Sequence, residues 1–360
     1  MALLNPRYRI PTAFVGAVIA LGAFVGLAPA VSAQLTTSAH SPTNAVTNNA
    51  SATTTTKPSA STSVVKAIPR PQPKLPVRVK SVTGSTSEVV EVTDVSWIVV
   101  LNGDVNEILF ALGMGDRIVA NDVTGYYPEE SKRKPKIGYG RTLSAETILS
   151  FTPTLVLGNT DAGPPAVLTQ LRSAGVAVVI VGAGEEASDS AKKIRRVAAA
   201  VGLIAAGDAL GDATELQLRS VQKRWTESAN RFEPRAVFLY LRGPRTQLLA
   251  GSGTRASAML LGAGATDAGA FFANVKGYVP ITSEALVLAD PDVIVVLDEG
   301  LESVGGIDGL LKIPGVALTK AGQRKRILSF DDLKLLELGP RTPEALDELS
   351  RELFKPYTKK

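Results

Sequence analysis

Short apolar runs alternate with amphipathic segments along the chain from about residue 97 onward. Trp97–Leu101 is a buried-strand pattern, and Val105–Leu112 is an amphipathic helix that ends at Gly113. The alternation continues, with strands expected at 117–120, 155–157 and 176–181 and a helix at 166–174. Because strands that alternate with helices form parallel sheets, we assign residues 92–182 to a first, Rossmann-like α/β lobe.

One pattern occurs twice in the chain, in which a hydroxyl residue is followed by Glu, then Pro, then an apolar triplet. The copies are Ser144-Ala-Glu146 with Pro153 and Leu155–Leu157, and Thr282-Ser-Glu284 with Pro291 and Val293–Val295. Each copy predicts a short helix with a Ser or Thr N-cap and Glu in its first turn, followed by a buried strand. A match over so few positions can arise by chance, and Glu also favours helix starts in general. Otherwise the repeat indicates two similar lobes, each of which presents a Glu at an equivalent helix start.

A long helical segment separates these lobes. From Ser188 to Ser228, apolar residues recur at helical spacing, with interruptions at Gly202 and Gly207. We therefore expect residues 183–232 to form a rigid connection that restricts hinge motion. Residues 233–360 form the second lobe, with strands expected at 235–242 and 326–330, helices at 256–261 and 343–353, and a loop at 299–309.

The N-terminal region has the composition of an export signal followed by a spacer. Residues 1–33 combine basic residues, an apolar stretch and a small-residue cleavage site at Val31-Ser-Ala33, and an uncleaved membrane anchor is the alternative. Residues 34–91 are rich in Ser, Thr and Pro and contain too little apolar surface to fold, so we expect a mobile spacer. Its positive charge could contact anionic lipids or wall polymers, or the spacer could be a solvated tether.

Composition narrows the possible chemistry. The chain has no Cys, so it has no disulfide, no thiolate site and no Cys-linked lipid anchor, and its one His, His40, lies in the expected spacer. The net charge of +5 is scattered and aromatic residues make up only 5%, so we expect no nucleic-acid binding. No phosphate-binding loop follows the first strand, and no nucleophile has a matched base. We therefore expect a protein that is not an enzyme, and the alternatives are a Rossmann-like enzyme or a wall-associated interaction module.

Two Tyr-x-Arg elements, one in each expected lobe, are the candidate binding residues. They are Tyr139-Gly-Arg141 and Tyr240-Leu-Arg242. In an extended segment the phenol and the guanidinium share a face, where the cation can lower the pKa of the phenol by stabilising its anion. A phenolate suits ferric iron, and Arg pairs with the carboxylates of a haem or a siderophore. The structural alternative is that each pair only packs and caps the end of a strand.

From about Ser96 to Phe354 the chain resembles the haem-binding periplasmic proteins of class III, the cobalamin and ferric-siderophore class of ABC-importer substrate-binding proteins, in their haemin-uptake branch. The motifs that carry the resemblance are Leu101–Gly113, Ile137–Glu146, Leu155–Pro164, Gly300–Gly306 and Gly339–Pro343. It implies two Rossmann-like lobes joined by a long helix, with haem held in the cleft as the transported ligand and passed to the subunits of an ABC permease. It also implies an exported protein, in the periplasm or at the outer face of the membrane or wall, which we expect to be a monomer.

The resemblance also assigns roles to individual residues. In relatives with a Gly-Tyr-x-Arg element the tyrosine coordinates haem iron, which implies a metal-ligand role for Tyr139 with Arg141 beside it. Other relatives pair a first-lobe His with a second-lobe Tyr and an Arg two residues later, which Tyr240 and Arg242 match, but no His matches the first lobe. Glu146 and Glu284 fall where relatives place the acidic residues that meet the permease. A carrier of a ferric siderophore or cobalamin is the alternative within the family.

Overall fold

The computed structural model describes residues 72–229 and 232–355. The expected signal segment, His40 and most of the expected spacer therefore lie outside the described residues. Within the described part, no helix combines the length and the apolar character needed to cross a membrane.

The last part of the expected spacer is a β-hairpin, so the interpretation of residues 34–91 as a mobile spacer is wrong for its end. Strands β1 (Val77–Thr83) and β2 (Thr86–Val92) pair antiparallel. Buried Ser81 attaches the hairpin to the first lobe, because its Oγ accepts from the Ile180 amide at 3.0 Å. Alternate valines of both strands pack against the core of that lobe, and this tertiary contact supplies the burial that the polar composition did not suggest.

The N-terminal lobe (N-lobe) has a parallel sheet, as expected, and its four strands lie in the order β4-β3-β5-β6. Its strands are β3 (Ile98–Val100), β4 (Ile118–Asn121), β5 (Leu155–Asn159) and β6 (Ala177–Val181). Alternate strand residues face two separate cores. One core lies against α1 (Gly103–Ala111) and α4 (Asp189–Ala200), and the other against α2 (Ala145–Leu149) and α3 (Pro165–Ser173). Because helices cover both faces of this sheet, the residues on both sides of each strand are apolar, and the strands appear in the sequence as continuous apolar runs.

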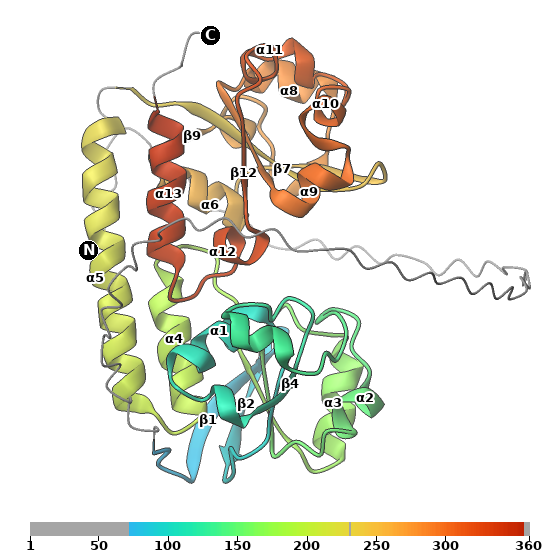
Figure 1. Cartoon of the computed structure of the whole chain (residues 1–360), viewed down its shortest axis with the longest axis vertical. Helices are drawn as coiled ribbons and strands as arrows, with labels where there is room; N and C mark the ends of the chain where they lie inside the picture. The colour runs from blue at the N-terminus through green and yellow to red at the C-terminus, as the bar shows by residue number, and fades with distance from the viewer. Residues whose placement is uncertain (1–71, 230–231, 356–360) are drawn as a thin grey trace, which may run out of the picture. The chain divides into compact units, whose positions relative to one another are not determined.

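The expected long helical segment is two helices rather than one nearly continuous helix. Gly202 adopts a φ of +72° after α4 ends, and the chain then turns into α5 (Ile204–Ala229). The two helices lie side by side (Figure 1), and α4 belongs to the core of the N-lobe. Leu218 and Val221 of α5 instead pack into the other lobe. Helix α5 is therefore the helix through which the chain passes from the N-lobe to the other lobe.

The contact between α4 and α5 leads to a prediction about Gly207. A Cβ atom at Gly207 would lie 2.2 Å from the Cβ of Ala198, so Gly207→Ala should force the helices apart and lower the free energy of unfolding by about 1–3 kcal/mol. Gly211 of the same helix is the matched control, because its added Cβ would meet only the flexible side chain of Arg195 at 3.0 Å. Gly211→Ala should stay within about 1 kcal/mol of the wild type in urea unfolding. Equal effects of the two substitutions would contradict this account.

The C-terminal lobe (C-lobe) has a mixed sheet in the order β10-β8-β7-β11-β12, and β9 pairs with β7. The strands are β7 (Arg235–Arg242), β8 (Thr246–Ala250), β9 (Thr266–Asp267), β10 (Tyr278–Pro280), β11 (Val293–Leu297) and β12 (Ile327–Phe330). Strands β8 and β10 pair antiparallel, so this lobe departs from the all-parallel Rossmann pattern. Helices α6 (Arg255–Gly262), α12 (Asp332–Leu336) and α13 (Thr342–Phe354) contribute with α5 to the core on one side of the sheet.

Short helices cover the other side of this sheet. They are α7 (Ala268–Phe271), α8 (Ser283–Ala289), α9 (Asp298–Ser303), α10 (Gly306–Leu310) and α11 (Lys320–Gln323). Buried residues of α7, α8, α10 and α11 share a core with β7 and β11. The prediction of a loop at 299–309 is wrong, because α9 and α10 occupy most of this segment. The prediction of two α/β lobes joined by a long helix is confirmed.

Candidate functional site

A cavity of about 1040 Å³ lies between the two lobes and is lined by both of them. Its size is at the upper end of the range usual for small-molecule sites. Tyr139 and Arg141 line it from the N-lobe, and Tyr240 and Arg242 line it from the C-lobe. The structure therefore brings the two Tyr-x-Arg elements, which are about a hundred residues apart in the chain, into one cleft.

A tightly packed loop presents Tyr139 and Arg141 to the cleft. Gly138 has a φ of +97°, and a Cβ atom at Gly140 would lie 2.5 Å from the carbonyl oxygen of Leu101. The buried carboxylate of Asp122 accepts hydrogen bonds from the Thr124 hydroxyl at 2.8 Å and from the Gly140 amide. These contacts hold the backbone between the two side chains, while the Tyr139 residue keeps 45% of its surface exposed.

Asp122 beneath this loop gives the site a pH dependence. Burial raises the pKa of Asp122 from 3.8 to about 6, so the folded protein binds this proton more tightly than the unfolded chain. The stabilising contribution of the protonated group is present below about pH 4 and is lost as the pH rises through 6. As the pH rises from 4 to 7, the wild type loses this contribution, whereas Asp122→Asn has no group there to titrate. The difference in the free energy of unfolding should therefore shift by about 2–3 kcal/mol in favour of the variant. Chemical denaturation across this pH range measures the difference, and a constant offset would contradict the prediction.

The second element lies at the end of β7, where Tyr240 and Arg242 share a face of the strand as expected. The guanidinium carbon of Arg242 lies 4.8 Å from the centroid of the Tyr240 ring. Arg242 also donates to the Leu241 carbonyl at 2.9 Å and forms an ion pair with Asp332 at the start of α12. The Tyr240 ring, the Leu241 carbonyl and the Asp332 carboxylate together hold the guanidinium of Arg242 in place.

The expected effect of the arginines on the phenol is outweighed by burial at Tyr139. Arg141 and Arg242 both lower the pKa of Tyr139, but the loss of solvent is the larger effect and raises that pKa above its usual value. The nearby Tyr240 phenol adds to this rise in the pKa of Tyr139. Tyr139 is therefore a neutral phenol at neutral pH, and it must lose a proton when it binds a metal ion.

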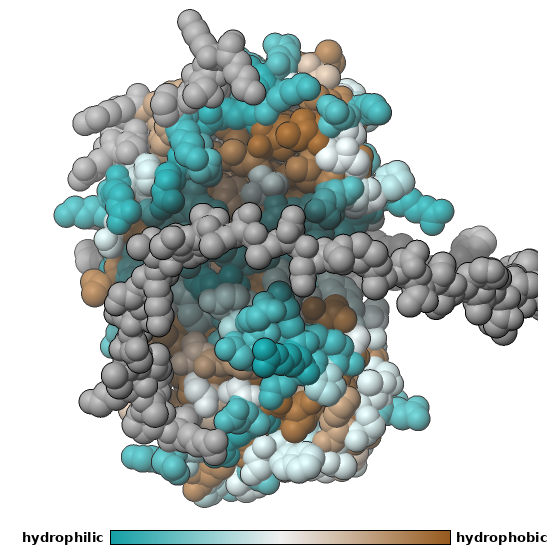
Figure 2. Space-filling model, in the orientation of Figure 1, coloured by the Kyte–Doolittle hydropathy of each residue, from teal (hydrophilic) through white to brown (hydrophobic). Residues whose placement is uncertain are grey.

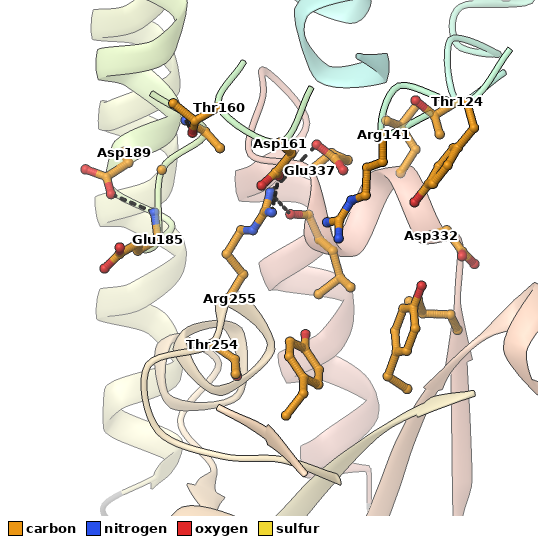
Figure 3. Close-up of a pocket in the computed structure, with 18 of the residues that line it drawn as sticks. Thr124, Arg141, Thr160, Asp161, Glu185, Asp189, Thr254, Arg255, Asp332 and Glu337 are labelled. Carbon is orange, nitrogen blue, oxygen red and sulfur yellow. Dashed lines mark hydrogen bonds and ion pairs between the residues drawn. The ribbon is translucent and has the colours of Figure 1, made fainter. Parts of the chain in front are cut away.

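Arg255, Asp161 and Glu337 form a bridge between the lobes within the cleft. Figure 3 shows Arg255 of α6 reaching toward Asp161 and Glu337, with which it forms ion pairs, at 3.8 Å in the case of Glu337. Thr160, Glu185 and Asp189 lie on one side of this bridge and Arg141 and Asp332 on the other. Burial raises the pKa of Glu337, with a further contribution from Asp104. Arg141 differs from Arg255, because it has no carboxylate partner among the described residues.

Two further contacts join the lobes beside the cavity. The Tyr126 hydroxyl lies 3.0 Å from Oδ2 of Asp331, to which it donates, and accepts from the Leu333 amide at 3.1 Å. Arg341 donates to Oε2 of Glu107 through Nε at 3.0 Å and Nη2 at 2.8 Å. Both contacts connect the N-lobe to the segment around α12, which is placed between the lobes in Figure 1.

Sequence reasoning missed several residues of the cleft, among them Tyr278, Tyr126, Arg255, Asp161 and Glu337. A signal existed for one of them. Gly277-Tyr278 stands just before the second copy of the repeat, as Gly138-Tyr139 stands just before the first copy. The others contribute single side chains with no recurring pattern. Among the described residues no group of three or more His, Cys, Asp or Glu side chains is arranged to hold a metal ion.

Glu146 and Glu284 lie outside the cleft, in the first turns of α2 and α8. Ser144 and Thr282 cap these helices as expected, accepting from the amides of Thr147 at 3.4 Å and Ala285 at 3.1 Å. Both glutamates are exposed. Neither lines the cavity, so the structure separates them from the four Tyr and Arg residues.

Comparison with known proteins places this architecture in a family. Residues 98–332 match the family model described as periplasmic binding protein. The periplasmic heme-binding protein RhuT from Roseiflexus sp. RS-1 is 45% identical with a TM-score of 0.68, over 72% of this chain and 98% of that chain. The periplasmic heme-binding protein BhuT in complex with two hemes is 38% identical with a TM-score of 0.66, over 71% of this chain and 97% of that chain.

A curated relative is similar over a comparable length. The uncharacterized ABC transporter substrate-binding lipoprotein YvrC of Bacillus subtilis (strain 168) is 27% identical over 69% of this chain and 76% of its own length. The family and these relatives are substrate-binding proteins rather than enzymes. Because the family match runs from the first strand of the N-lobe sheet to α12 in the C-lobe, and so spans both walls of the cleft, the chain belongs to the periplasmic binding protein family.

Proposed function

We propose that this protein captures haem in the interlobe cleft and delivers it to an ABC importer. The observation that carries the proposal is that Tyr139 and Tyr240, contributed by different lobes, line one cavity. Phenolate oxygen is a protein ligand of haem iron, and both phenols have a guanidinium close by. The family and its haem-binding relatives support the same conclusion.

The cleft also matches the other features of a haem. Arg141 is available for a carboxylate, because no acidic side chain of the described residues neutralises it, whereas Arg242 and Arg255 already have acidic partners. The aromatic rings of Tyr240 and Tyr278 offer apolar contact area to a flat macrocycle. We propose that Tyr139 and Tyr240 bind iron, that Arg141 pairs with a propionate, and that Arg242 orients Tyr240. The protein binds its ligand and does not convert it.

A titration with ferric protoporphyrin IX, followed by absorbance, tests this function. Saturable binding with the visible spectrum of a phenolate-ligated ferric haem is expected. Cyanocobalamin and a ferric siderophore are the controls, because both are alternative cargoes of this class of proteins. Tight binding of either control without a spectral response to haem would reject the haem proposal and favour that ligand.

We further propose that Glu146 and Glu284 contact the two permease subunits through basic residues. Both are exposed at the starts of equivalent helices, away from the cavity. Exposed apolar residues accompany Glu284, since Val287 and Leu288 of α8 expose 49% and 57% of their surface. In the view of Figure 2, hydrophobic residues gather on the C-lobe. Glu146→Lys with Glu284→Lys should abolish haem import by cells while haem affinity of the purified protein is unchanged, and undiminished import would contradict the proposal.

We propose that the protein acts as an exported monomer, in the periplasm or at the outer face of the membrane. Its homologues are periplasmic binding proteins, which supports this location. The Bacillus subtilis relative is named a lipoprotein, whereas this chain has no Cys. The cleavage of residues 1–33 stays a prediction, which N-terminal sequencing of the exported protein tests. The spacer role of the part of residues 34–91 that lies outside the described residues also stays a prediction.

A further inference from the structure

Tyr278 occupies the place in the C-lobe that Tyr139 occupies in the N-lobe. Each follows a glycine with positive φ, +97° at Gly138 and +66° at Gly277. Each stands just before a Ser- or Thr-capped helix with Glu in its first turn, α2 after Tyr139 and α8 after Tyr278. The internal repeat therefore extends to the tyrosine, although the arginine that follows Tyr139 has no counterpart after Tyr278.

The sheet places Tyr278 next to Tyr240. Tyr278 begins β10, which pairs with β8, and β8 pairs with β7, so the two tyrosines stand on the strands on either side of β8 in the same sheet. Their ring centroids are 5.9 Å apart in an edge-to-face arrangement, with an angle of 64° between the rings. Both rings line the interlobe cavity.

The hydroxyl of Tyr278 is available to a ligand. Within the described part of the chain it has no hydrogen-bond partner, in contrast to the Tyr126 hydroxyl, which bonds to Asp331 and Leu333. Burial raises the pKa of Tyr278, while Arg255 and Arg141 act in the opposite direction by stabilising its anion. Tyr278 thus combines a free phenol with nearby guanidinium groups, as the Tyr-x-Arg elements do, but its arginines come from other segments of the chain.

We propose that Tyr278 is a further haem-binding residue, and that its phenol can coordinate the ferric iron in place of Tyr240. The proposal rests on the haem-binding function proposed above. On coordination the O–H bond of the phenol breaks, an O–Fe bond forms and the proton passes to solvent, without a change in the oxidation state of the iron. The C-lobe then offers two neighbouring phenols, so iron can be ligated over a range of haem positions in the cleft.

Four proteins test the proposal in titrations with ferric protoporphyrin IX. They are the wild type, Tyr139→Phe/Tyr240→Phe, the same double variant with Tyr278→Phe, and the same double variant with Tyr127→Phe as the matched control. Tyr127 suits this purpose because its ring packs under Arg341 at 3.5 Å and does not line the cavity. Phenylalanine keeps the ring packing, so the comparison isolates the hydroxyl.

The double variant should keep the phenolate charge-transfer band in its visible spectrum. Adding Tyr278→Phe should abolish that band and raise the Kd about tenfold further, whereas adding Tyr127→Phe should change neither. If the double variant lacks the band, or if Tyr278→Phe has no more effect than Tyr127→Phe, the role of Tyr278 is refuted while haem binding by the wild type still stands. Failure of the wild type to bind haem would refute the proposed function itself.

Discussion

Replacement of Tyr139 and Tyr240 together by phenylalanine is expected to weaken the binding of ferric haem by about 100-fold, which corresponds to about 2.7 kcal/mol. The substitutions remove both phenol oxygens that reach the cavity from Tyr-x-Arg elements, while they keep the rings and their packing. The residual affinity comes from apolar contacts, from Arg141 and from Tyr278. Each single variant should lose less than the pair, because the remaining phenol still binds iron.

Absorbance titration at fixed pH measures this loss, and circular dichroism of the apo variants shows whether they stay folded. Tyr127→Phe is the control again, because it removes a phenol that does not line the cavity. Haem affinity of the double variant within threefold of the wild type would contradict the assignment of Tyr139 and Tyr240 as iron ligands. The affinity of the wild type should also increase with pH, because burial raises the pKa of the Tyr139 phenol that has to ionise.

The largest expected effect on stability comes from the ion pair between Asp104 and Lys193 in the core of the N-lobe. Their side chains are 0% and 1% exposed. Asp104 also accepts from Asn159 Nδ2, which lies 2.9 Å and 2.8 Å from its two carboxylate oxygens. Asp104→Ala leaves the ammonium group of Lys193 buried without a partner, so the free energy of unfolding should fall by about 3–5 kcal/mol.

A double variant separates the cost of the unpaired charge from the value of the pair. In Asp104→Asn/Lys193→Met the methionine fills the space of the lysine without a charge, and the amide oxygen of the new asparagine can still accept from Asn159. Most of the lost stability should return in urea or thermal unfolding, because replacing a buried pair by uncharged groups is often nearly neutral. If the double variant is as unstable as Asp104→Ala, the isolated charge of Lys193 is not the source of the loss.

Several features of the fold could be predicted because short segments encode them. The strand Arg235–Arg242 has the bounds that its apolar run indicated, and Ser144 and Thr282 cap their helices as the repeat indicated. The division of the helical segment after residue 188 could not be predicted in the same way. Its apolar spacing continues through Gly202, and only the positive φ of that glycine divides it into α4 and α5. The hairpin β1–β2 was missed because its stability depends on contact with β6 rather than on its own composition.

By itself the sequence determined the two-lobe α/β plan, the matched helix starts of Glu146 and Glu284, and the pairing of each phenol with an arginine, because these depend on residues that are near neighbours in the chain. Tertiary structure decided that Tyr139 and Tyr240 line one cavity, and that Tyr278 and the ion pair of Arg255 with Asp161 lie in the same cavity. It also decided that burial affects the pKa of the Tyr139 phenol more than the arginines do. Those outcomes depend on contacts between distant segments and on the removal of water from the cleft. Neither is encoded in any local pattern.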